Sequence, residues 1–161
     1  MAYAQSPQVN GNAIDSTSLD IVAKKSDGSV LRLGSMFKSA KYGNKITGRK
    51  ALHGTSAQKV GRSFGVNEPD GSLTLYKQAA QDFVDWLGDG YLGVTFDLSL
   101  AYVIRGQSAV ITDTVVGCQL LGDGSDVSEG GEPVAVEFPL DIMECVLNGV
   151  APIPAELRAN R

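Results

Sequence analysis

The residues that could do chemistry are few, and the largest group lies in an acidic, glycine-rich stretch. Its four carboxylates are Asp123, Asp126, Glu129 and Glu132. Clustered carboxylates suggest calcium, but this spacing lacks the ligand positions and the final bidentate glutamate of an EF-hand loop. A solvated acidic hairpin loop is the better interpretation, and we expect no metal and no cofactor.

The remaining candidates argue against an enzyme. The one histidine, His53, lies in a basic stretch with no acidic residue near it in the sequence that could orient it. The sequence contains no P-loop, no dinucleotide-binding glycine fingerprint after a strand and no HExxH motif. We therefore expect a protein without catalytic activity.

Two cysteines, Cys118 and Cys145, allow two interpretations. Both lie in or beside segments with strand character, where they would be small buried residues in a reducing compartment. The alternative is a disulfide, within one subunit or between two, that forms after release from the cell. The sequence leaves both open.

Composition predicts one folded domain. Hydrophobic residues make up 43% of the 161 residues and charged residues 20%, which is typical of a globular chain. No apolar run approaches the roughly 18 residues of a membrane-spanning helix, and the first residues show no signal peptide. We expect a soluble intracellular product without membrane insertion.

Charge is divided unevenly along the chain. Residues 1–62 contain ten Lys and Arg against three Asp, whereas residues 63–161 contain four Lys and Arg against fifteen acidic residues. A basic region can bind nucleic acid, or the acidic side of another copy of the same chain. The third interpretation is that the charges only solvate separate loops.

The clearest secondary-structure signal is alternation over residues 94–104. Six apolar residues occupy the even positions, and the odd positions begin with Thr95, Asp97 and Ser99, which predicts a half-buried strand. Further strands are expected at 19–25, 29–34, 72–76, 109–121 and 134–141, and one helix at 78–90. Pro139 has no N–H to donate, so its position should be an edge, a bulge or a switch between sheets.

Residues 35–67 are basic and contain no acidic residue, and their apolar residues follow neither a helical nor a strand period. They either contain short strands or form a long functional loop that orders on a partner, and we favour the loop. Strands near 45–49 and 59–64 are allowed within it.

Together the elements predict a mostly β fold, an antiparallel β-sandwich or barrel with one flanking α-helix and a long basic loop. We divide the chain into an N-terminal arm (1–16), a β domain (17–150) that contains the basic loop (35–67), and a C-terminal tail (151–161).

Four segments follow one another in the order GSLTLYKQAAQDFVDWLGDG, VTFDLSLAYVI, TVVGCQLLGDG and EPVAVEFPLDIMECVLNGV. Through them, and over residues 17–150 as a whole, the sequence resembles the tail tube proteins of contractile-tailed bacteriophages, and it is similar to type VI secretion tubes. The resemblance implies a structural virion protein, assembled in the host cytoplasm, whose hexameric rings stack into a hollow tube that conducts DNA into the host. It also implies contacts with a sheath, with baseplate and with terminator proteins, and DNA that passes without specific binding.

On this interpretation the two longest strands line the lumen, with Thr95, Asp97, Ser99 and Asp113 facing the channel. Acidic residues there would repel phosphates and let DNA slide. Contacts between rings would join the basic loop to the acidic stretch of another ring. The candidates are Lys38, Lys41, Lys45, Arg49, Lys50, Lys59 and Arg62 on one side, and Asp123, Asp126, Glu129 and Glu132 on the other. The alternatives are a secretion-system tube, another tail component, or a small nucleic-acid-binding β-barrel that uses the basic loop.

Overall fold

The computed structural model describes residues 8–9, 12–13, 19–33, 37–53, 55, 57–103, 110–127 and 129–157. The strands are β1 (Gln8–Val9), β2 (Asn12–Ala13), β3 (Leu19–Lys25), β4 (Val30–Arg32), β5 (Phe37–Gly43), β6 (Ile46–Thr47), β7 (Ala51–His53), β8 (Lys59–Arg62), β9 (Val66–Asn67), β10 (Asp70–Tyr76), β11 (Phe96–Val103), β12 (Val110–Leu120), β13 (Gly124–Asp126), β14 (Ala135–Asp141) and β15 (Glu144–Leu147). The helices are α1 (Lys77–Leu87) and two 3₁₀ turns, η3 (Tyr91–Gly93) and η4 (Ala155–Leu157). The prediction of a mostly β, antiparallel fold with a flanking helix is confirmed.

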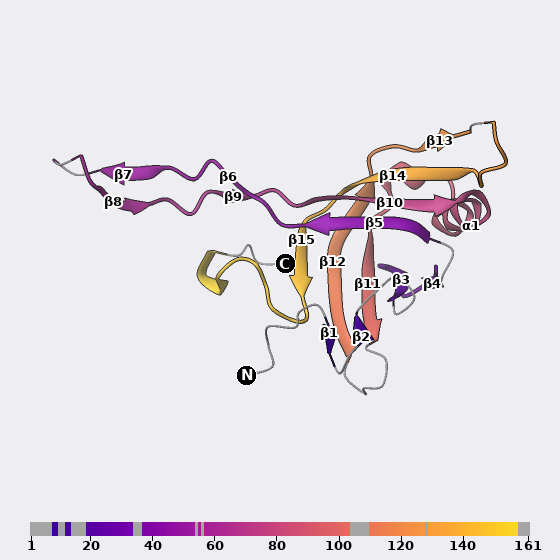
Figure 1. Cartoon of the computed structure of the whole chain (residues 1–161), viewed down its shortest axis with the longest axis horizontal. Coiled ribbons are helices and arrows are strands. Elements are labelled where there is room, and N and C mark those ends of the chain that lie inside the picture. The colour runs from indigo at the N-terminus through magenta and orange to yellow at the C-terminus, as the bar shows by residue number, and fades with distance from the viewer. Residues whose placement is uncertain are drawn as a thin grey trace.

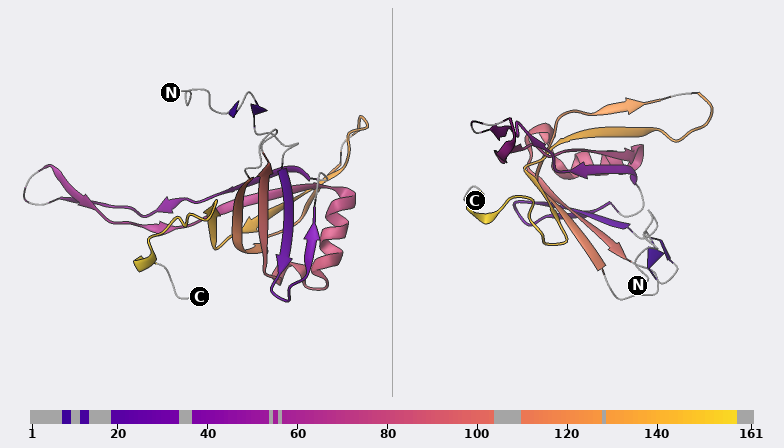
Figure 2. Two further views of the ribbon diagram at one scale, coloured as in Figure 1. Left: turned by 90° about the horizontal axis from the view of Figure 1, so that it is seen from below. Right: turned by 60° about the vertical axis from the view of Figure 1, so that its left-hand side comes forward.

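The main sheet has the order β4-β3-β11-β12-β14-β10-β5, with β15 beside β12 and β13 beside β14. All of its pairings are antiparallel. Strand β12 changes partners along its length. Its pairing with β15 ends at Val116 and its pairing with β11 ends at Cys118, while Gln119 and Leu120 pair with β14. The sheet therefore bends into two layers, which Figures 1 and 2 show from three sides. We call β4-β3-β11-β12-β15 the first layer and β5-β10-β14-β13 the second.

The core fills the space between these layers and α1. The even positions of β11 are buried as far as Leu100, as the alternation predicts. The Phe83 ring of α1 lies 5.4 Å from that of Phe96 in the first layer and 5.7 Å from that of Phe138 in the second, both edge-on. Such aromatic pairs add to the hydrophobic gain from burial, so Phe83 links all three elements.

The helix was predicted at 78–90 and is observed at Lys77–Leu87. Its buried stripe is Ala79, Ala80, Phe83 and Leu87, which matches the apolar face that the sequence predicts. Gly88 follows at φ 83°, a conformation that glycine adopts without steric cost, so the helix ends there.

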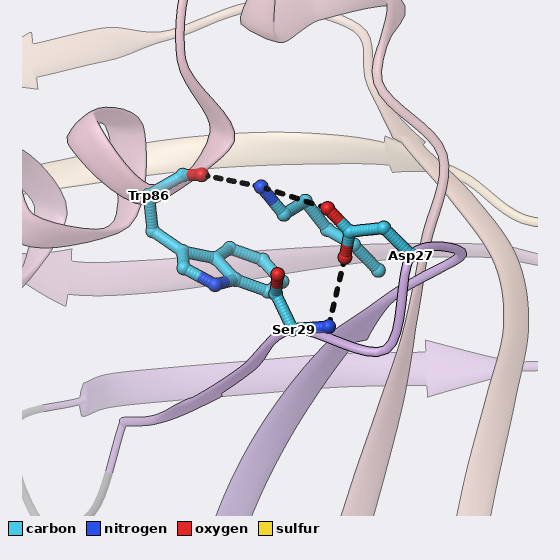
Figure 3. A network of polar contacts seen from close by, with 4 residues as sticks. Asp27, Ser29 and Trp86 are labelled. Atoms are coloured by element: carbon cyan, nitrogen blue, oxygen red, sulfur yellow. Dashed lines mark hydrogen bonds and ion pairs between the residues drawn. The ribbon is translucent and has the colours of Figure 1, made fainter.

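The end of the helix is tied to the β3–β4 turn (Figure 3). The Lys25 ammonium donates to the Trp86 carbonyl at 2.9 Å and lies 4.9 Å from the centre of the indole ring. Asp27 is 4.0 Å from the same ammonium, and its carboxylate accepts the Ser29 N–H at 2.8 Å. The Ser29 hydrogen bond, helped by Lys25, lowers the pKa of Asp27.

Pro139 lies where strand β14 changes neighbours. Residues 135–137 pair with β13, whereas Leu140 and Asp141 pair with β12. Between them Pro139 uses only its carbonyl, which accepts the Leu121 N–H at 2.8 Å. The missing N–H is therefore accommodated at a boundary between two partner strands, consistent with the prediction from the sequence.

Residues 35–67 differ from the favoured prediction of a long loop. Phe37–Gly43 forms β5, which pairs with β10 in the second layer. After it the chain forms a long two-stranded projection, in which β6 pairs with β9 and β7 pairs with β8. We call residues 44–69 the arm. It extends away from both layers along the longest axis of the molecule (Figure 1). The interpretation of short strands is therefore the correct one for this segment.

Of the proposed N-terminal arm, the structure describes only β1 and β2, which pair with each other. Of the proposed C-terminal tail it describes 151–157, which includes η4. The division into an N-terminal segment (1–16), a β domain (17–150) and a C-terminal tail (151–161) stays a prediction.

Candidate assembly surfaces

The arm displays most of the basic candidates. Lys45, Arg49, Lys50, Lys59 and Arg62 are all exposed, with Glu68 as the acidic residue among the described part of the arm. The ion pairs found among the described residues, Lys25–Asp27 and Arg32–Asp20, involve none of these five cations. The arm is thus an extended ribbon of positive charge, and no ion pair within the described ranges neutralises it.

Between the β6–β9 and β7–β8 ladders, side-chain contacts connect the two strands of the arm. Arg49 Nε donates to the Phe64 carbonyl at 3.0 Å, and its guanidinium lies 5.4 Å from the Phe64 ring centre. Ser63 Oγ accepts the Lys50 N–H at 2.9 Å. Arg49 therefore supports the arm itself as well as carrying charge. Farther along, Leu52 and Val60 are 53% and 69% exposed, which leaves apolar surface uncovered near the tip.

Lys38 and Lys41 are also exposed, but they belong to β5 and lie outside the arm. Lys38 lines an open groove of about 480 Å³ on the second layer together with Asp126 and Glu137. It therefore lies beside acidic residues of its own chain, and the structure does not bring it together with the arm cations.

The acidic candidates lie at the opposite end of the molecule from the arm. Asp123 directly precedes β13, and Asp126 is its last residue. Glu129 and Glu132 lie in the connection to β14, and all four side chains are exposed. Figure 1 places β13 and its connection at the end where α1 lies, and the tip of the arm at the other end. The exposed side of α1 adds Asp82 and Asp85. The basic candidates of the arm and the acidic candidates therefore lie at opposite ends of the long axis.

Among the described residues, no group of three or more His, Cys, Asp and Glu is arranged to hold a metal ion. Asp123 instead accepts a hydrogen bond from the Tyr91 hydroxyl, which raises the pKa of that phenol. His53 is exposed at the end of β7. Across the described ranges, no helix has the length and hydropathy that a membrane crossing needs.

Thr95, Asp97 and Ser99 lie on the outer side of the first layer, because Phe96, Leu98 and Leu100 face the core. Thr95 Oγ1 accepts from Gln119 Nε2 at 2.8 Å. Asp97 accepts the Gly117 N–H at 2.9 Å.

Register adds further members to this surface, which we call the polar sheet face. Opposite residues of antiparallel strands share a face, so Val22 and Lys24 of β3, Arg32 of β4 and Thr114 of β12 belong to it.

The polar sheet face is not simply acidic. Lys24 lies opposite Asp97 in the β3–β11 ladder. Arg32 is 3.6 Å from Asp20, which lies on the same face of β3. The expectation of an acid-lined surface is therefore modified, because two cations accompany the carboxylates.

Asp113 does not share this face, contrary to the grouping made from the sequence. It lies opposite Leu100, which is buried, so its side chain is on the inner side of the first layer. There it accepts the Tyr42 hydroxyl at 2.5 Å and the Asn148 N–H at 3.2 Å. Asp113 lines an open groove of about 990 Å³ at the base of the arm, beside Tyr102 and Leu147.

Both cysteines are free and buried. Cys118 and Cys145 lie on neighbouring strands, β12 and β15, on the core side of the first layer. Burial raises the pKa of Cys118 to about 12, with a smaller contribution from Asp97, and burial also raises the pKa of Cys145. The geometry agrees with the interpretation of two small buried residues.

Two positions that the sequence did not single out shape these surfaces. Gly117 has φ +67° in a bulge of β12, and its N–H reaches Asp97. A glycine among β-branched residues in a strand is a signal for such a bulge. Asn44, at the base of the arm, hydrogen-bonds to the backbone of Cys145. No local sequence signal indicates this contact, because the partners are 101 residues apart.

The two antiparallel layers with a flanking helix match the fold of a solved tail tube structure. The resemblance to tail tube proteins seen in the sequence is confirmed in the fold. No protein-family model and no curated protein matches this chain.

Solved structures do match it, at identities that show the fold alone. The SPP1 tail tube is 14% identical with a TM-score of 0.62, over 92% of this chain and 87% of that one. The tube-terminating cap of the anti-feeding prophage is 13% identical with a TM-score of 0.57, over 91% of this chain and 98% of that one. A type six secretion system protein is 10% identical with a TM-score of 0.51, over 84% and 90%.

Proposed function

We propose that this chain is the structural subunit of a bacteriophage tail tube, assembled in the host cytoplasm and carried in the virion. One observation carries the proposal: in a chain with the tail-tube fold, the exposed cations of the arm lie at one end of the long axis and a group of exposed carboxylates lies at the other. A contact between two different patches of identical subunits repeats without limit unless it closes into a ring. The separation of the two charged groups supports head-to-tail assembly, and the proposed role is structural.

In the proposed assembly, hexameric rings form from the layers, and the arm of one ring reaches the acidic end of a subunit in the next. The contact residues are Lys45, Arg49, Lys50, Lys59 and Arg62 on the arm, and Asp123, Asp126, Glu129 and Glu132 opposite. Lys38 and Lys41 contribute less to this contact between rings, because they lie on β5 and not on the arm. Outer edges of β4 and β5 have no partner strand in the described sheet, and neighbouring subunits would cover them.

The polar sheet face is the proposed lumen surface, with Thr95, Asp97 and Ser99 facing the channel. Lys24 and Arg32 lie near carboxylates there, so a phosphate backbone would meet little net charge and could slide. A sheath, a baseplate and a terminator are the proposed partners at the outside and at the two ends of the tube.

Negative-stain electron microscopy of the purified chain at rising concentration tests the proposal. Hollow tubes or stacked rings of uniform diameter are expected. A monomer at every concentration, also in the presence of seeds from a sonicated tail preparation, would contradict it. Tube formation without a lumen wide enough for a DNA duplex would instead favour a different tube or tail component.

The exposed, basic arm favours one second candidate, a small nucleic-acid-binding β-barrel. Its binding would come from phosphate contacts, so the affinity for duplex DNA would fall steeply as salt rises. A titration of labelled DNA at about 50 mM and about 200 mM salt distinguishes the candidates, because phosphate contacts by several cations weaken binding by orders of magnitude over this range.

A further inference from the structure

Asn44 lies where β5 ends and the arm begins, and its side chain hydrogen-bonds as a strand would. Its Nδ2 donates to the Cys145 carbonyl at 2.9 Å, and its Oδ1 accepts the Cys145 N–H at 3.1 Å. A carboxamide carries the same donor and acceptor as a peptide group, so the two bonds reproduce one hydrogen-bonded pair of an antiparallel ladder. This contact joins the second layer to β15 of the first, although β5 and β15 share no backbone ladder.

The returning strand of the arm is attached to the same point. Asn67 Nδ2 donates to Asn44 Oδ1 at 3.3 Å. The Glu68 N–H donates to the Lys45 carbonyl at 2.7 Å. Both strands of the arm are therefore connected, directly or through one bond, to the Asn44 side chain as they leave the layers.

Beyond this point the arm has little other support. Its described strands pair only with each other, and Figures 1 and 2 show it standing clear of both layers. At ~3.3 Å per residue, the outgoing strand from position 45 to 53 extends roughly 30 Å, so a tilt of about 10° at the base moves its far end by about 5 Å. A displacement of this size exceeds what a hydrogen bond or an ion pair tolerates.

The space beside the base permits such a tilt. The groove of about 990 Å³ lies directly next to Asn44 and is lined by Gly43, Lys45 and Asp70. The β5–β10 ladder ends at the pair of Gly43 with Asp70, and beyond it only the two strands of the arm pair with each other. Two-stranded ribbons twist readily, so the ladder alone does not fix a direction.

We infer that Asn44 is a positioning residue, which fixes the direction in which the arm leaves the layers so that its cationic end reaches a second copy of the chain. The inference rests on the proposed function for the partner, and on the geometry of the base for the positioning. On this inference, the half-buried Asn44 side chain at the base of the arm controls a contact that the far end of the arm makes with a second copy of the chain.

Hydrogen exchange of the full chain tests the positioning directly. In Asn44→Ala, the amides of Cys145, Asn67 and Glu68 should exchange at least tenfold faster than in the unaltered chain, whereas those of Leu98 and Phe138 in the core should not change. Gln119→Ala is the matched control, because it removes a different amide whose 2.8 Å bond to Thr95 lies outside the arm. It should leave the exchange of the arm unchanged.

Asn44→Asp is the second variant, used in case the alanine variant folds poorly. Its carboxylate still accepts the Cys145 N–H but cannot donate to the Cys145 carbonyl, so exchange at the arm base should rise less than in Asn44→Ala. Both variants should form shorter tubes than the unaltered chain. Equal exchange in all variants, or a rise that spreads evenly through the core, would overturn the inference. If the unaltered chain forms no tubes, the proposed function fails, while the exchange data still decide whether Asn44 positions the arm.

Discussion

The Tyr42 hydroxyl donates a 2.5 Å hydrogen bond to Asp113 and thereby joins β5 of the second layer to β12 of the first. The Tyr102 hydroxyl lies 2.5 Å from the same phenol oxygen. Burial raises the pKa of Tyr42, and the bond to Asp113 raises it further. The phenol consequently remains protonated and available as a donor throughout the ordinary pH range.

Removal of this contact should destabilise the fold. Tyr42→Phe leaves a half-buried carboxylate with one donor fewer, and Asp113→Asn replaces a charged acceptor by a neutral one. We expect each change to lower the free energy of unfolding by about 1–3 kcal/mol, the range for hydrogen bonds to charged groups. Urea denaturation followed by circular dichroism measures the loss.

The double variant, Tyr42→Phe with Asp113→Asn, shows whether the loss of unfolding free energy comes from the interaction between the two side chains. Because Tyr42→Phe removes the bond that Asp113→Asn only weakens, the combined loss should be smaller than the sum of the two by about 1 kcal/mol. Additive losses would show that the two side chains stabilise the fold independently.

The first layer could be read from the sequence because its strands have one buried and one exposed face. Alternation over 94–104 predicted β11, and the apolar stripe predicted α1. The arm could not be read in this way. Its outer strands β7 and β8 are exposed on both faces, so no hydrophobic alternation marks them, and charge alone does not distinguish a ribbon from a loop.

The error at Asp113 has a different cause. The register of β11 and β12 shifts beside Phe96, where β12 contains the extra residue of a bulge at Val116–Gly117. Residues 113 and 115 face inward before the bulge, and residues 118 and 120 face inward after it. A bulge interrupts the period of two, so a polar residue counted from one end of the strand is assigned to the wrong face.

Gly117→Ala tests the importance of this bulge. With φ +67° a side chain is strained, and an added Cβ would lie 2.6 Å from Met143 Cγ. We expect a loss of about 1–2 kcal/mol in unfolding free energy, the cost of a left-handed conformation with a Cβ, because Met143 is exposed and can move aside. Thermal unfolding should show a lower midpoint.

Gly93→Ala is the control for this prediction. A Cβ at position 93 would meet nothing within 4 Å, and its φ is not in the left-handed region. Its unfolding midpoint should match that of the unaltered chain. A Gly117→Ala variant as stable as the control would mean that the bulge tolerates any residue.

Thiol reactivity should depend on unfolding and on pH in a defined direction. Only the thiolate reacts with disulfide reagents, and burial holds the Cys118 thiol protonated up to a pKa of about 12. With 5,5′-dithiobis(2-nitrobenzoic acid) at pH 8, the folded chain should react slowly and the urea-unfolded chain should release two equivalents. Rapid reaction of both thiols in the folded chain would contradict their burial.

The same shift affects stability. Between the ordinary thiol pKa of 9.0 and about 12, the unfolded chain has lost a proton from Cys118 that the folded chain keeps. The unfolded state therefore binds fewer protons, and stability falls as pH rises through this window. Cys118→Ala should remove this part of the alkaline dependence, which urea titrations at several pH values would measure.

Charge reversal tests the proposed head-to-tail contact most directly. Lys45→Glu combined with Arg49→Glu should abolish long tubes while the layers stay folded, because the arm would then be repelled by the acidic end of the next subunit. Lys45→Arg combined with Arg49→Lys is the matched control, since it changes the same two exposed side chains but keeps both positive charges, and its variant should still form tubes. Electron microscopy and circular dichroism supply the two readouts.

A complementary variant distinguishes a direct contact from general repulsion. Asp123→Lys with Asp126→Lys reverses the acidic end and should also prevent tubes when present alone. Combined in one chain with the reversed arm, it should restore them at least in part, because each arm again meets the opposite charge. Tube formation by the reversed arm alone would exclude Lys45 and Arg49 from the interface. Failure of the combined variant, with its fold intact, would place the receiving surface elsewhere than Asp123 and Asp126.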